Sequence, residues 1–194
     1  MAEISSLCVY CGSRMPTDPA HREAARNLGQ QLGENQIRLI YGGGHVGLMG
    51  IIADATLDAH GQVIGIIPGH LYDIEVSHEK LTELHVVDSM HLRKEKMFQM
   101  SDAFVILPGG LGTLDETFEM LTWRQLRLHD KPIILVNHKQ YWQPLLDLIN
   151  HMITAGFVEK EALGFFRVVE RMEDILPALL AAPEEEIPAD ISKF

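Results

Sequence analysis

Residues 38–50 read Arg-Leu-Ile-Tyr-Gly-Gly-Gly-His-Val-Gly-Leu-Met-Gly, a short apolar run followed by a glycine-rich loop. An amphipathic helical pattern then continues to residue 59. A strand that enters a helix through glycines is typical of α/β proteins, in which backbone N–H groups at the helix N-terminus bind phosphate. Residues 104–116 repeat the arrangement, since the apolar run 104–107 precedes Pro-Gly-Gly-Leu-Gly-Thr-Leu-Asp-Glu.

Apolar runs and helical patterns alternate along the chain around these two loops. The expected strands are residues 7–11, 38–41, 63–67, 84–87, 104–107, 133–136 and 167–169. The expected helices are residues 21–34, 48–59, 91–100, 114–127, 141–155 and 172–181. This alternation predicts a Rossmann-like, doubly wound parallel sheet in a three-layer α/β/α single domain. We expect that domain to span residues 1–182 and residues 183–194 to form an acidic, flexible tail.

Composition excludes several classes of protein. The 194 residues are 46% hydrophobic, enough for a core, and 16 Lys+Arg against 27 Asp+Glu give a net charge of −11, which argues against nucleic-acid binding. The sequence has no basic leader and no apolar stretch of about 18 residues, so we expect no membrane insertion and a cytoplasmic location. Cys8 and Cys11 fall in an expected strand, where they point to opposite faces, which favours buried structural thiols over a redox pair.

The first loop matches a dinucleotide fingerprint only in part. Gly42, Gly44 and Gly47 have the G-x-G-x-x-G spacing, but the next strand leads into Pro68 where an acidic residue should bind a ribose hydroxyl. NAD is therefore disfavoured, and the absence of a G-K-[ST] sequence after either loop excludes a Walker-type site. We predict no cofactor, and a phosphate bound by backbone N–H groups.

The second loop has two interpretations. Thr113-x-x-Glu116 is a capping box, in which the threonine caps the helix and the glutamate returns a hydrogen bond to it. A cap alone does not require the three glycines that precede it, so a second phosphate-binding loop is the alternative.

Five segments together resemble the Lonely Guy (LOG) family, cytokinin-activating 5′-monophosphate phosphoribohydrolases long mislabelled as lysine decarboxylases. The first two are the glycine loops 41–50 and 108–116. The others are Cys-Val-Tyr-Cys-Gly-Ser at residues 8–13, Ser-Met-His-Leu-Arg-Lys at 89–94 and Leu-Thr-Trp-Arg-Gln-Leu-Arg-Leu-His at 121–129. Two departures are Asp115, where glutamate is usual, and Arg14-Met15-Pro16, where small residues are common.

The resemblance implies hydrolysis of the N-glycosidic bond of a nucleoside 5′-monophosphate, AMP or an N6-modified AMP, to free base and ribose 5-phosphate. It implies a homodimer and makes Arg93 and Glu116 the catalytic pair. The substrate contacts that it implies are Gly43, Gly44, Gly47, Glu75, Lys94, Gly109, Gly110, Gly112, Thr113, Asp115 and Thr122.

The chemistry of the expected reaction assigns roles to some of these residues. Cleavage builds positive charge on the ribose, so Glu116 suits a base or electrostatic stabiliser, and a helix dipole at its first turn would favour its ionised form. An ionised glutamate is a poor acid, so another donor, which the sequence does not identify, assists the leaving base. Glu119 is expected to have a supporting role. Arg93 and Lys94 are adjacent on a helix and point about 100° apart, so only one should contact the reacting atoms.

Several alternatives stay open at this point. A non-catalytic nucleotide or cofactor carrier, similar to molybdenum-cofactor carriers, would use the same loops. A pyridoxal-phosphate lysine decarboxylase would need a Schiff-base lysine, and Lys94 is the only lysine in the quoted motifs. His45 and His91 could line the pocket, but no metal is predicted. Four apolar residues could form either a dimer interface or ordinary core: Met97, Phe98, Met100 and Trp123.

Overall fold

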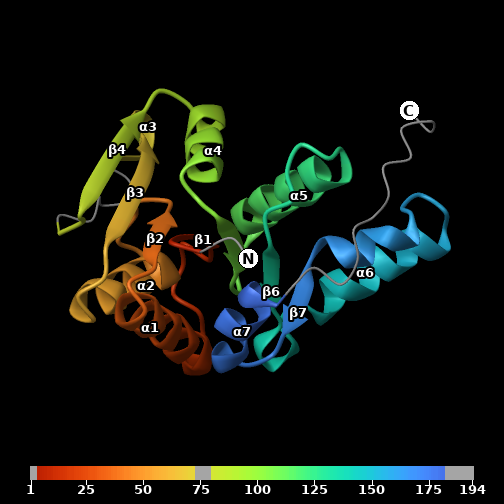
Figure 1. Cartoon of the computed structure of the whole chain (residues 1–194), viewed down its shortest axis with the longest axis horizontal. Helices are drawn as coiled ribbons and strands as arrows, with labels where there is room; N and C mark the ends of the chain where they lie inside the picture. The colour runs from red at the N-terminus through yellow and green to blue at the C-terminus, as the bar shows by residue number, and fades with distance from the viewer. Residues whose placement is uncertain (1–3, 73–79, 182–194) are drawn as a thin grey trace.

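The computed structural model describes residues 4–72 and 80–181 (Figure 1). The predicted acidic tail and Glu75 lie outside these residues. The described chain forms one α/β/α unit built on a single sheet, which confirms the predicted fold class.

All pairings in the sheet are parallel, and each strand lies within one residue of its predicted bounds. The strands are β1 (Ser6–Tyr10), β2 (Arg38–Tyr41), β3 (Val63–Pro68), β4 (Glu83–Val87), β5 (Ala103–Ile106), β6 (Ile133–Val136) and β7 (Arg167–Val169). The central strands are buried along their length, as expected for a sheet covered on both faces.

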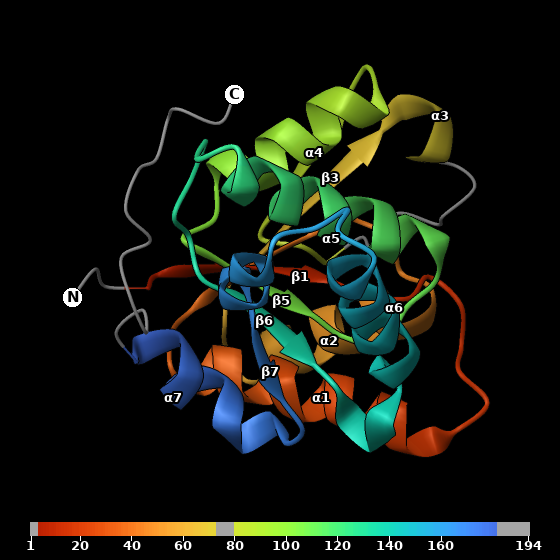
Figure 2. The ribbon, with the colours of Figure 1, turned by 90° about the vertical axis from the view of Figure 1, so that its right-hand side faces the viewer.

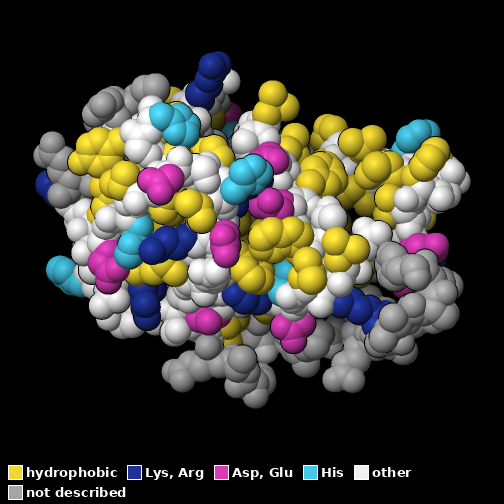
Figure 3. All heavy atoms as spheres, turned by 90° about the horizontal axis from the view of Figure 1, so that it is seen from above, with side chains coloured by type: hydrophobic (Ala, Val, Ile, Leu, Met, Phe, Trp, Pro, Cys, Tyr) yellow, Lys and Arg dark blue, Asp and Glu magenta, His cyan; other side chains and the backbone are white. Residues whose placement is uncertain are grey.

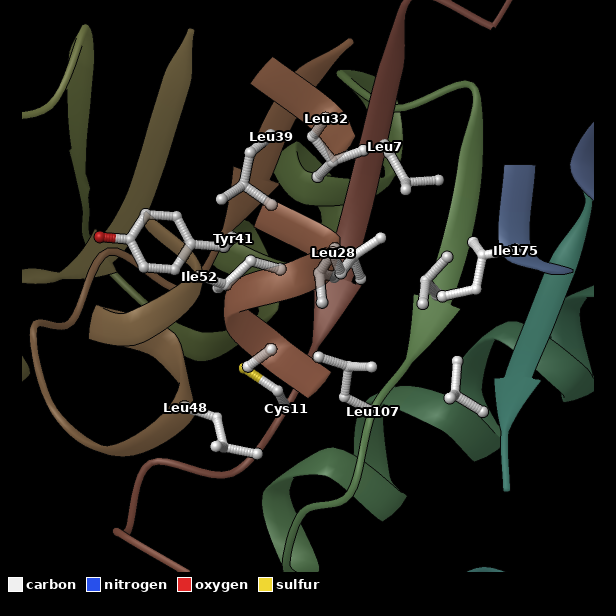
Figure 4. Packing of buried hydrophobic residues seen from close by; sticks show 14 of the residues in the cluster. Leu7, Cys11, Leu28, Leu32, Leu39, Tyr41, Leu48, Ile52, Leu107 and Ile175 are labelled. Atoms are coloured by element: carbon white, nitrogen blue, oxygen red, sulfur yellow. The ribbon is translucent and has the colours of Figure 1, made fainter. Parts of the chain in front are cut away.

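Helices cover both faces of the sheet (Figure 2). The α-helices are α1 (Pro19–Glu34), α2 (Gly47–Asp58), α3 (Gly69–Tyr72), α4 (Met90–Gln99), α5 (Leu111–Gln125), α6 (Gln143–Thr154) and α7 (Ile175–Leu180). Helices α4, α5 and α6 pack on one face and α1, α2 and α7 on the other, each over its own apolar cluster. Figure 4 shows the cluster beneath α1 and α2.

The helices differ from the prediction in one added element and in several boundaries, which move by at most three residues. The sequence pattern did not predict α3, which is only four residues long. Helix α6 begins at Gln143 rather than at residue 141 because its N-cap residue, Trp142, has φ −89° and ψ 5°, outside the helical values. The preceding Lys139 and Gln140 have positive φ angles of 52° and 59°.

The two cysteines behave as predicted. Cys8 belongs to the cluster under α4–α6 and Cys11 to the cluster under α1 and α2, so they point to opposite faces of the sheet. Both are free thiols, and burial raises the pKa of each well above its ordinary value. These are unreactive structural thiols.

The strand order is β4-β3-β2-β1-β5-β6-β7. Chain progression therefore reverses between β1 and β5, and in open α/β sheets ligands bind beyond the carboxyl ends of the strands at such a reversal. The loops that leave β1 and β5 flank this position, and the loop that leaves β2 lies next to it. Both glycine loops belong to this group.

Asp102, just before β5, ties that strand to the start of β1. Its Oδ2 accepts four hydrogen bonds of 2.8–3.0 Å from the backbone N–H and hydroxyl groups of Ser5 and Ser6. Partial burial raises the pKa of Asp102, but these hydrogen bonds outweigh burial and hold the pKa below its ordinary value of 3.8.

We expect Asp102→Ala to lower the free energy of unfolding at neutral pH by about 1 kcal/mol, since the carboxylate is partly exposed. Because the folded-state pKa is lowered, the contribution is complete above pH 3.8 and is lost as the pH falls through the folded value. Urea unfolding of both proteins between neutral pH and about pH 3 measures this. A difference between the two proteins that stays constant as the pH falls would contradict it.

Candidate active site

Gly12, in the loop after β1, joins the two glycine loops. Its carbonyl oxygen accepts a hydrogen bond of 2.9 Å from Leu48 N–H at the start of α2, and its own N–H donates one of 3.1 Å to the carbonyl of Pro108. Gly12 therefore holds together Leu48, about 36 residues further along the chain, and Pro108, about 60 residues beyond Leu48. All three lie at the reversal of strand order. The two predicted phosphate-binding loops are thus linked through Gly12.

Gly47 shows why the first loop needs glycine. Its φ is +60°, and a Cβ at this position would lie 2.5 Å from the carbonyl carbon of Ser13 and 2.6 Å from the nitrogen of Arg14. Only glycine combines this backbone conformation with such a close approach of the β1 loop. Because the backbone of Arg14 lies against Gly47, the segment Arg14-Met15-Pro16, which departs from the family pattern, begins beside the first glycine loop.

The helices that follow the two glycine loops begin without a capping side chain. The N-cap residues of α1 and α4, Asp18 and Ser89, accept hydrogen bonds from Ala20 N–H and Leu92 N–H. By contrast, the N-cap residues of α2 and α5 are Val46 and Gly110, and neither makes a side-chain capping bond. Helices α6 and α7 also lack a capping side chain, but α2 and α5 are the two that follow the glycine loops. Apart from Leu48 N–H, which donates to Gly12, the first-turn N–H groups of α2 and α5 are therefore suited to an anionic ligand. A Cβ on Gly110 or on Gly112 would meet no atom within 4 Å, so this side of the loop is open.

The predicted capping box is wrong. Helix α5 begins at Leu111, two residues before Thr113, because the glycines allow the helix to start earlier. Thr113 is buried and packs against Gly109, where a Cβ would lie 2.6 Å from the threonine Cβ. Glu116 is consequently the sixth residue of the helix, beyond the first turn, where the helix dipole acts only weakly.

Arg93 is held at the carboxyl ends of two strands. Its Nε donates to the carbonyl of Ile66 at 3.1 Å and its Nη2 to the carbonyl of Gly42 at 2.9 Å. The residue is only 6% exposed. A Cβ on Gly42 would lie 2.1 Å from Nη2, so the first glycine of the loop makes room for the guanidinium. A buried, rigidly placed positive charge therefore lies beside the first loop.

Lys94 points away from Arg93, as the helical geometry predicts. Its Nζ lies 3.1 Å from Asp115 Oδ2 and 3.0 Å from Glu119 Oε1, and so links α4 to α5. Burial lowers the pKa of Lys94, but the two carboxylates outweigh burial and the net pKa is raised. A Schiff-base lysine requires the opposite shift, so this ion pair argues against the decarboxylase alternative. It also gives Glu119 the expected supporting role.

Glu116 is partly buried on α5, a helix that packs against β1. Its charge raises the pKa values of Tyr10 and Cys8, although burial is the larger cause for both. The positive charge of Arg93 acts on the same Cys8 thiol and lowers its pKa. The predicted catalytic pair thus acts electrostatically on one point, the Cys8 thiol of β1. The Tyr10 hydroxyl is buried on the same face of the sheet as the Cys8 thiol.

The structure does not bring every predicted residue to this point. Thr122 is exposed and lies about 9 Å farther along α5 than Glu116, while Glu75 is outside the described residues. His45 faces Asp54 at 3.3 Å, and His91 is exposed. No cluster of three or more His, Cys, Asp or Glu that could bind a metal is found in the part of the chain that the structure describes. Within that same part, none of the helices has the length and apolarity needed to cross a bilayer.

The predicted interface residues divide between core and surface. Met97 is 1% exposed and belongs to the core beneath α4–α6. Phe98, Met100 and Trp123 are partly buried. The Phe98 ring contacts the Trp123 ring edge-on at 5.1 Å. The core interpretation is confirmed for Met97, and the other three remain available for contact.

Three contacts of the site could not be seen in the sequence pattern. They are the carbonyl of Ile66 as a partner of Arg93, the linking role of Gly12, and a hydrogen bond from Tyr141 to Gly109. Each joins residues distant in sequence, and no local periodicity reports such pairs.

Comparison with known proteins gives the class to which this fold and site belong. A family model described as possible lysine decarboxylase matches residues 49–179. The chain belongs to this family, which is the LOG family. Among its relatives is the cytokinin riboside 5′-monophosphate phosphoribohydrolase of Rhodococcoides fascians, 42% identical over 175 residues that cover 90% of this chain and 88% of the relative. The Arabidopsis thaliana protein of that name, LOG1, is 39% identical over 91% of this chain and 86% of its own length.

Solved structures confirm the fold. The molybdenum cofactor binding protein of Rippkaea orientalis superposes with a TM-score of 0.68 over 91% of this chain and 96% of its own. At 20% sequence identity this likeness concerns the fold alone, so it does not favour the carrier alternative.

Proposed function

We propose that the protein hydrolyses the N-glycosidic bond of a nucleoside 5′-monophosphate, and releases the free base and ribose 5-phosphate. The observation that carries the proposal is the junction at Gly12, which places two uncapped helix N-termini side by side at the reversal of strand order. The relatives named above carry the corresponding activity in their names, at about 40% identity over most of the chain.

The site residues have separate roles in this proposal. The open side of the second loop, at Gly110 and Gly112, together with the first loop at Gly43, Gly44 and Gly47, binds the 5′-phosphate through backbone N–H groups. Glu116 stabilises the positive charge that develops on the ribose and orients the attacking water. Arg93 supplies a fixed positive charge at the other side of the reacting bond. Lys94 acts through its ion pairs, which hold α4 against α5 and thereby set the distance between the catalytic pair.

The substrate is tested directly by incubating the purified protein with AMP and with N6-isopentenyl-AMP, and by measuring the free base and ribose 5-phosphate by chromatography. We expect both products in equal amounts from at least one of these nucleotides, and none from adenosine, because the phosphate supplies the contacts with both loops. Equal cleavage of adenosine would contradict the phosphate assignment. If neither nucleotide releases a base, the proposed function is wrong.

We further propose that two copies associate through the face formed by α4 and α5. Figure 3, which views the molecule from above Figure 1, shows hydrophobic side chains among acidic, basic and histidine side chains. Exposed apolar residues here include Leu92 and Leu111, at 44% and 86% exposure, beside the partly buried Phe98 and Trp123. Such an interface would give Thr122 of one copy a route to the substrate of the other. Light scattering in solution measures the mass, and a monomer at micromolar concentration would contradict the proposal.

The buried free thiols of Cys8 and Cys11 are typical of a reducing compartment, which supports our proposal of a cytoplasmic location.

A further inference from the structure

The connection between β6 and α6 is held in an unusual conformation beside the second glycine loop. Lys139 and Gln140 both have positive φ, a region that non-glycine residues rarely adopt. Asn137, which is 3% exposed, stabilises the turn because its side-chain oxygen accepts a hydrogen bond of 2.8 Å from Trp142 N–H. Lys139 Nζ also contacts Asp18 Oδ2 at 3.0 Å, at the start of α1. Contacts from several elements thus hold a conformation that the backbone alone would not favour.

This turn directs one side chain to the glycine loop. The Tyr141 hydroxyl donates a hydrogen bond of 2.6 Å to the carbonyl oxygen of Gly109. The Tyr141 ring is also fixed, since it contacts the His21 ring edge-on at 5.5 Å and the Trp142 ring at 4.8 Å. Helices α5 and α6 lie on the same face of the sheet, so the hydrogen bond spans two neighbouring strand-to-helix connections (Figure 2).

Three successive carbonyl groups of the second loop each accept a hydrogen bond from the protein itself. The carbonyl of Pro108 accepts from Gly12, that of Gly109 from Tyr141, and that of Gly110 from Leu114 N–H at 3.0 Å. A trans peptide unit is planar, with its N–H directed opposite to its C=O. Holding the Gly109 carbonyl therefore also fixes the direction of the Gly110 N–H, at the N-cap of α5.

The peptide unit between Gly109 and Gly110 needs such a hydrogen bond to hold its orientation. The peptide unit between Gly109 and Gly110 is flanked by two residues without side chains, so its rotation meets less steric resistance than elsewhere in the chain. A rotated unit would present a carbonyl oxygen, rather than an N–H, to an anion at the loop. Gly12 and Leu114 hold the neighbouring peptide units, and Tyr141 is the group that holds this one.

We propose that Tyr141 is a positioning residue for the 5′-phosphate: its hydroxyl holds the Gly109 carbonyl so that the Gly110 N–H faces the bound phosphate. The inference rests on the proposed function for the identity of the ligand. Tyr141 acts through the loop and touches no reacting atom, so its effect belongs to binding of the phosphate in ground and transition states alike.

The test is Tyr141→Phe, which removes the hydroxyl and keeps the ring packing against His21. We expect KM for the nucleotide and Kd for ribose 5-phosphate, measured by calorimetry, each to rise about fivefold, and kcat to change less than about twofold. The Kd of adenosine, which lacks the phosphate and is measured in the same way, should not change. The matched control is Thr154→Val, which deletes another hydroxyl-to-carbonyl hydrogen bond, to Asn150 on the exposed side of α6, and should leave all these constants unchanged.

Two results would overturn the inference. One is an unchanged Kd for ribose 5-phosphate in Tyr141→Phe, and the other is an equal weakening of adenosine and ribose 5-phosphate, which a general loosening of the site would produce. Failure of the proposed function is distinguishable from either. If the wild-type protein binds ribose 5-phosphate but releases no base from any nucleotide, the hydrolase proposal fails. The Kd of ribose 5-phosphate for Tyr141→Phe, divided by that for wild type, still decides the role of Tyr141. A wild-type protein that does not bind ribose 5-phosphate refutes the phosphate contact on which the role of Tyr141 rests, whereas release of the base decides the hydrolase proposal separately.

Discussion

Glu116→Gln is expected to lower kcat for nucleotide hydrolysis by about 100- to 1,000-fold while the protein stays folded. The substitution keeps the size and hydrogen-bonding shape of the side chain but removes the negative charge that faces the developing positive charge on the ribose. Glu116 is the sixth residue of α5 and its carboxylate takes no part in capping the helix. We expect the free energy of unfolding to stay within about 0.5 kcal/mol of wild type.

The measurement is release of the free base under saturating nucleotide, together with a thermal unfolding curve for each protein. Glu34→Gln is the matched control, since Glu34 ends α1 just before the amino end of β2, accepts a hydrogen bond from Gln30 and is exposed. It should hydrolyse nucleotide at the wild-type rate. A Glu116→Gln protein that retains full kcat would remove Glu116 from the mechanism, and one that unfolds would show a structural role instead.

Arg93→Lys should reduce both activity and stability. The guanidinium donates simultaneously to the carbonyls of Ile66 and Gly42, at the ends of β3 and β2. A lysine ammonium is a compact charge on a flexible stem and does not reproduce this planar, forked geometry. One buried carbonyl is then left without its donor, which costs about 2 kcal/mol of unfolding free energy. We expect kcat to fall about 100-fold, since the charge is no longer held in place beside the first loop.

Two further variants separate the catalytic from the structural effect of Arg93. Gly42→Ala keeps the arginine but places a methyl group where Nη2 now lies, so kcat should fall in the same direction. Arg167→Lys is the matched control, because Arg167 also donates to two backbone carbonyls, those of Ala178 and Ala181, far from the glycine loops. It should lose stability and keep kcat. If Arg93→Lys behaves in the same way as this control, Arg93 is only a structural residue.

The accuracy of the predicted strands has a simple physical origin. Every strand of a parallel sheet covered on both faces is a short apolar run, and the polar loops and amphipathic helices on either side mark its ends. Such a run is visible in sequence, so β2 and β6 are predicted to the residue. The beginning of α5 is different. Thr113 and Glu116 have the spacing of a capping box, but the packing of Thr113 on Gly109 lets the helix start at Leu111.

In the candidate site too, residues within local motifs could be predicted from the sequence, and contacts between distant residues could not. The glycine loops, Arg93 and Glu116 follow from the order of motifs in the chain, because each motif comes directly after an expected strand. The partners of Lys94 do not follow from it, since Asp115 and Glu119 lie more than 20 residues away on another helix. The mixed charges around Lys94 in the sequence could equally have formed a solvated helix surface.

The sequence alone determined that the protein is a parallel α/β domain with two glycine loops at the ends of strands, because burial and backbone geometry leave local patterns of apolar residues and glycines. Tertiary structure alone decided the rest: the reversal of strand order between β1 and β5, the junction of both loops at Gly12, and the hydrogen bond from Tyr141 to Gly109. These contacts join residues far apart in the chain, and their partners are chosen only when the packed helices and strands bring them within hydrogen-bonding distance.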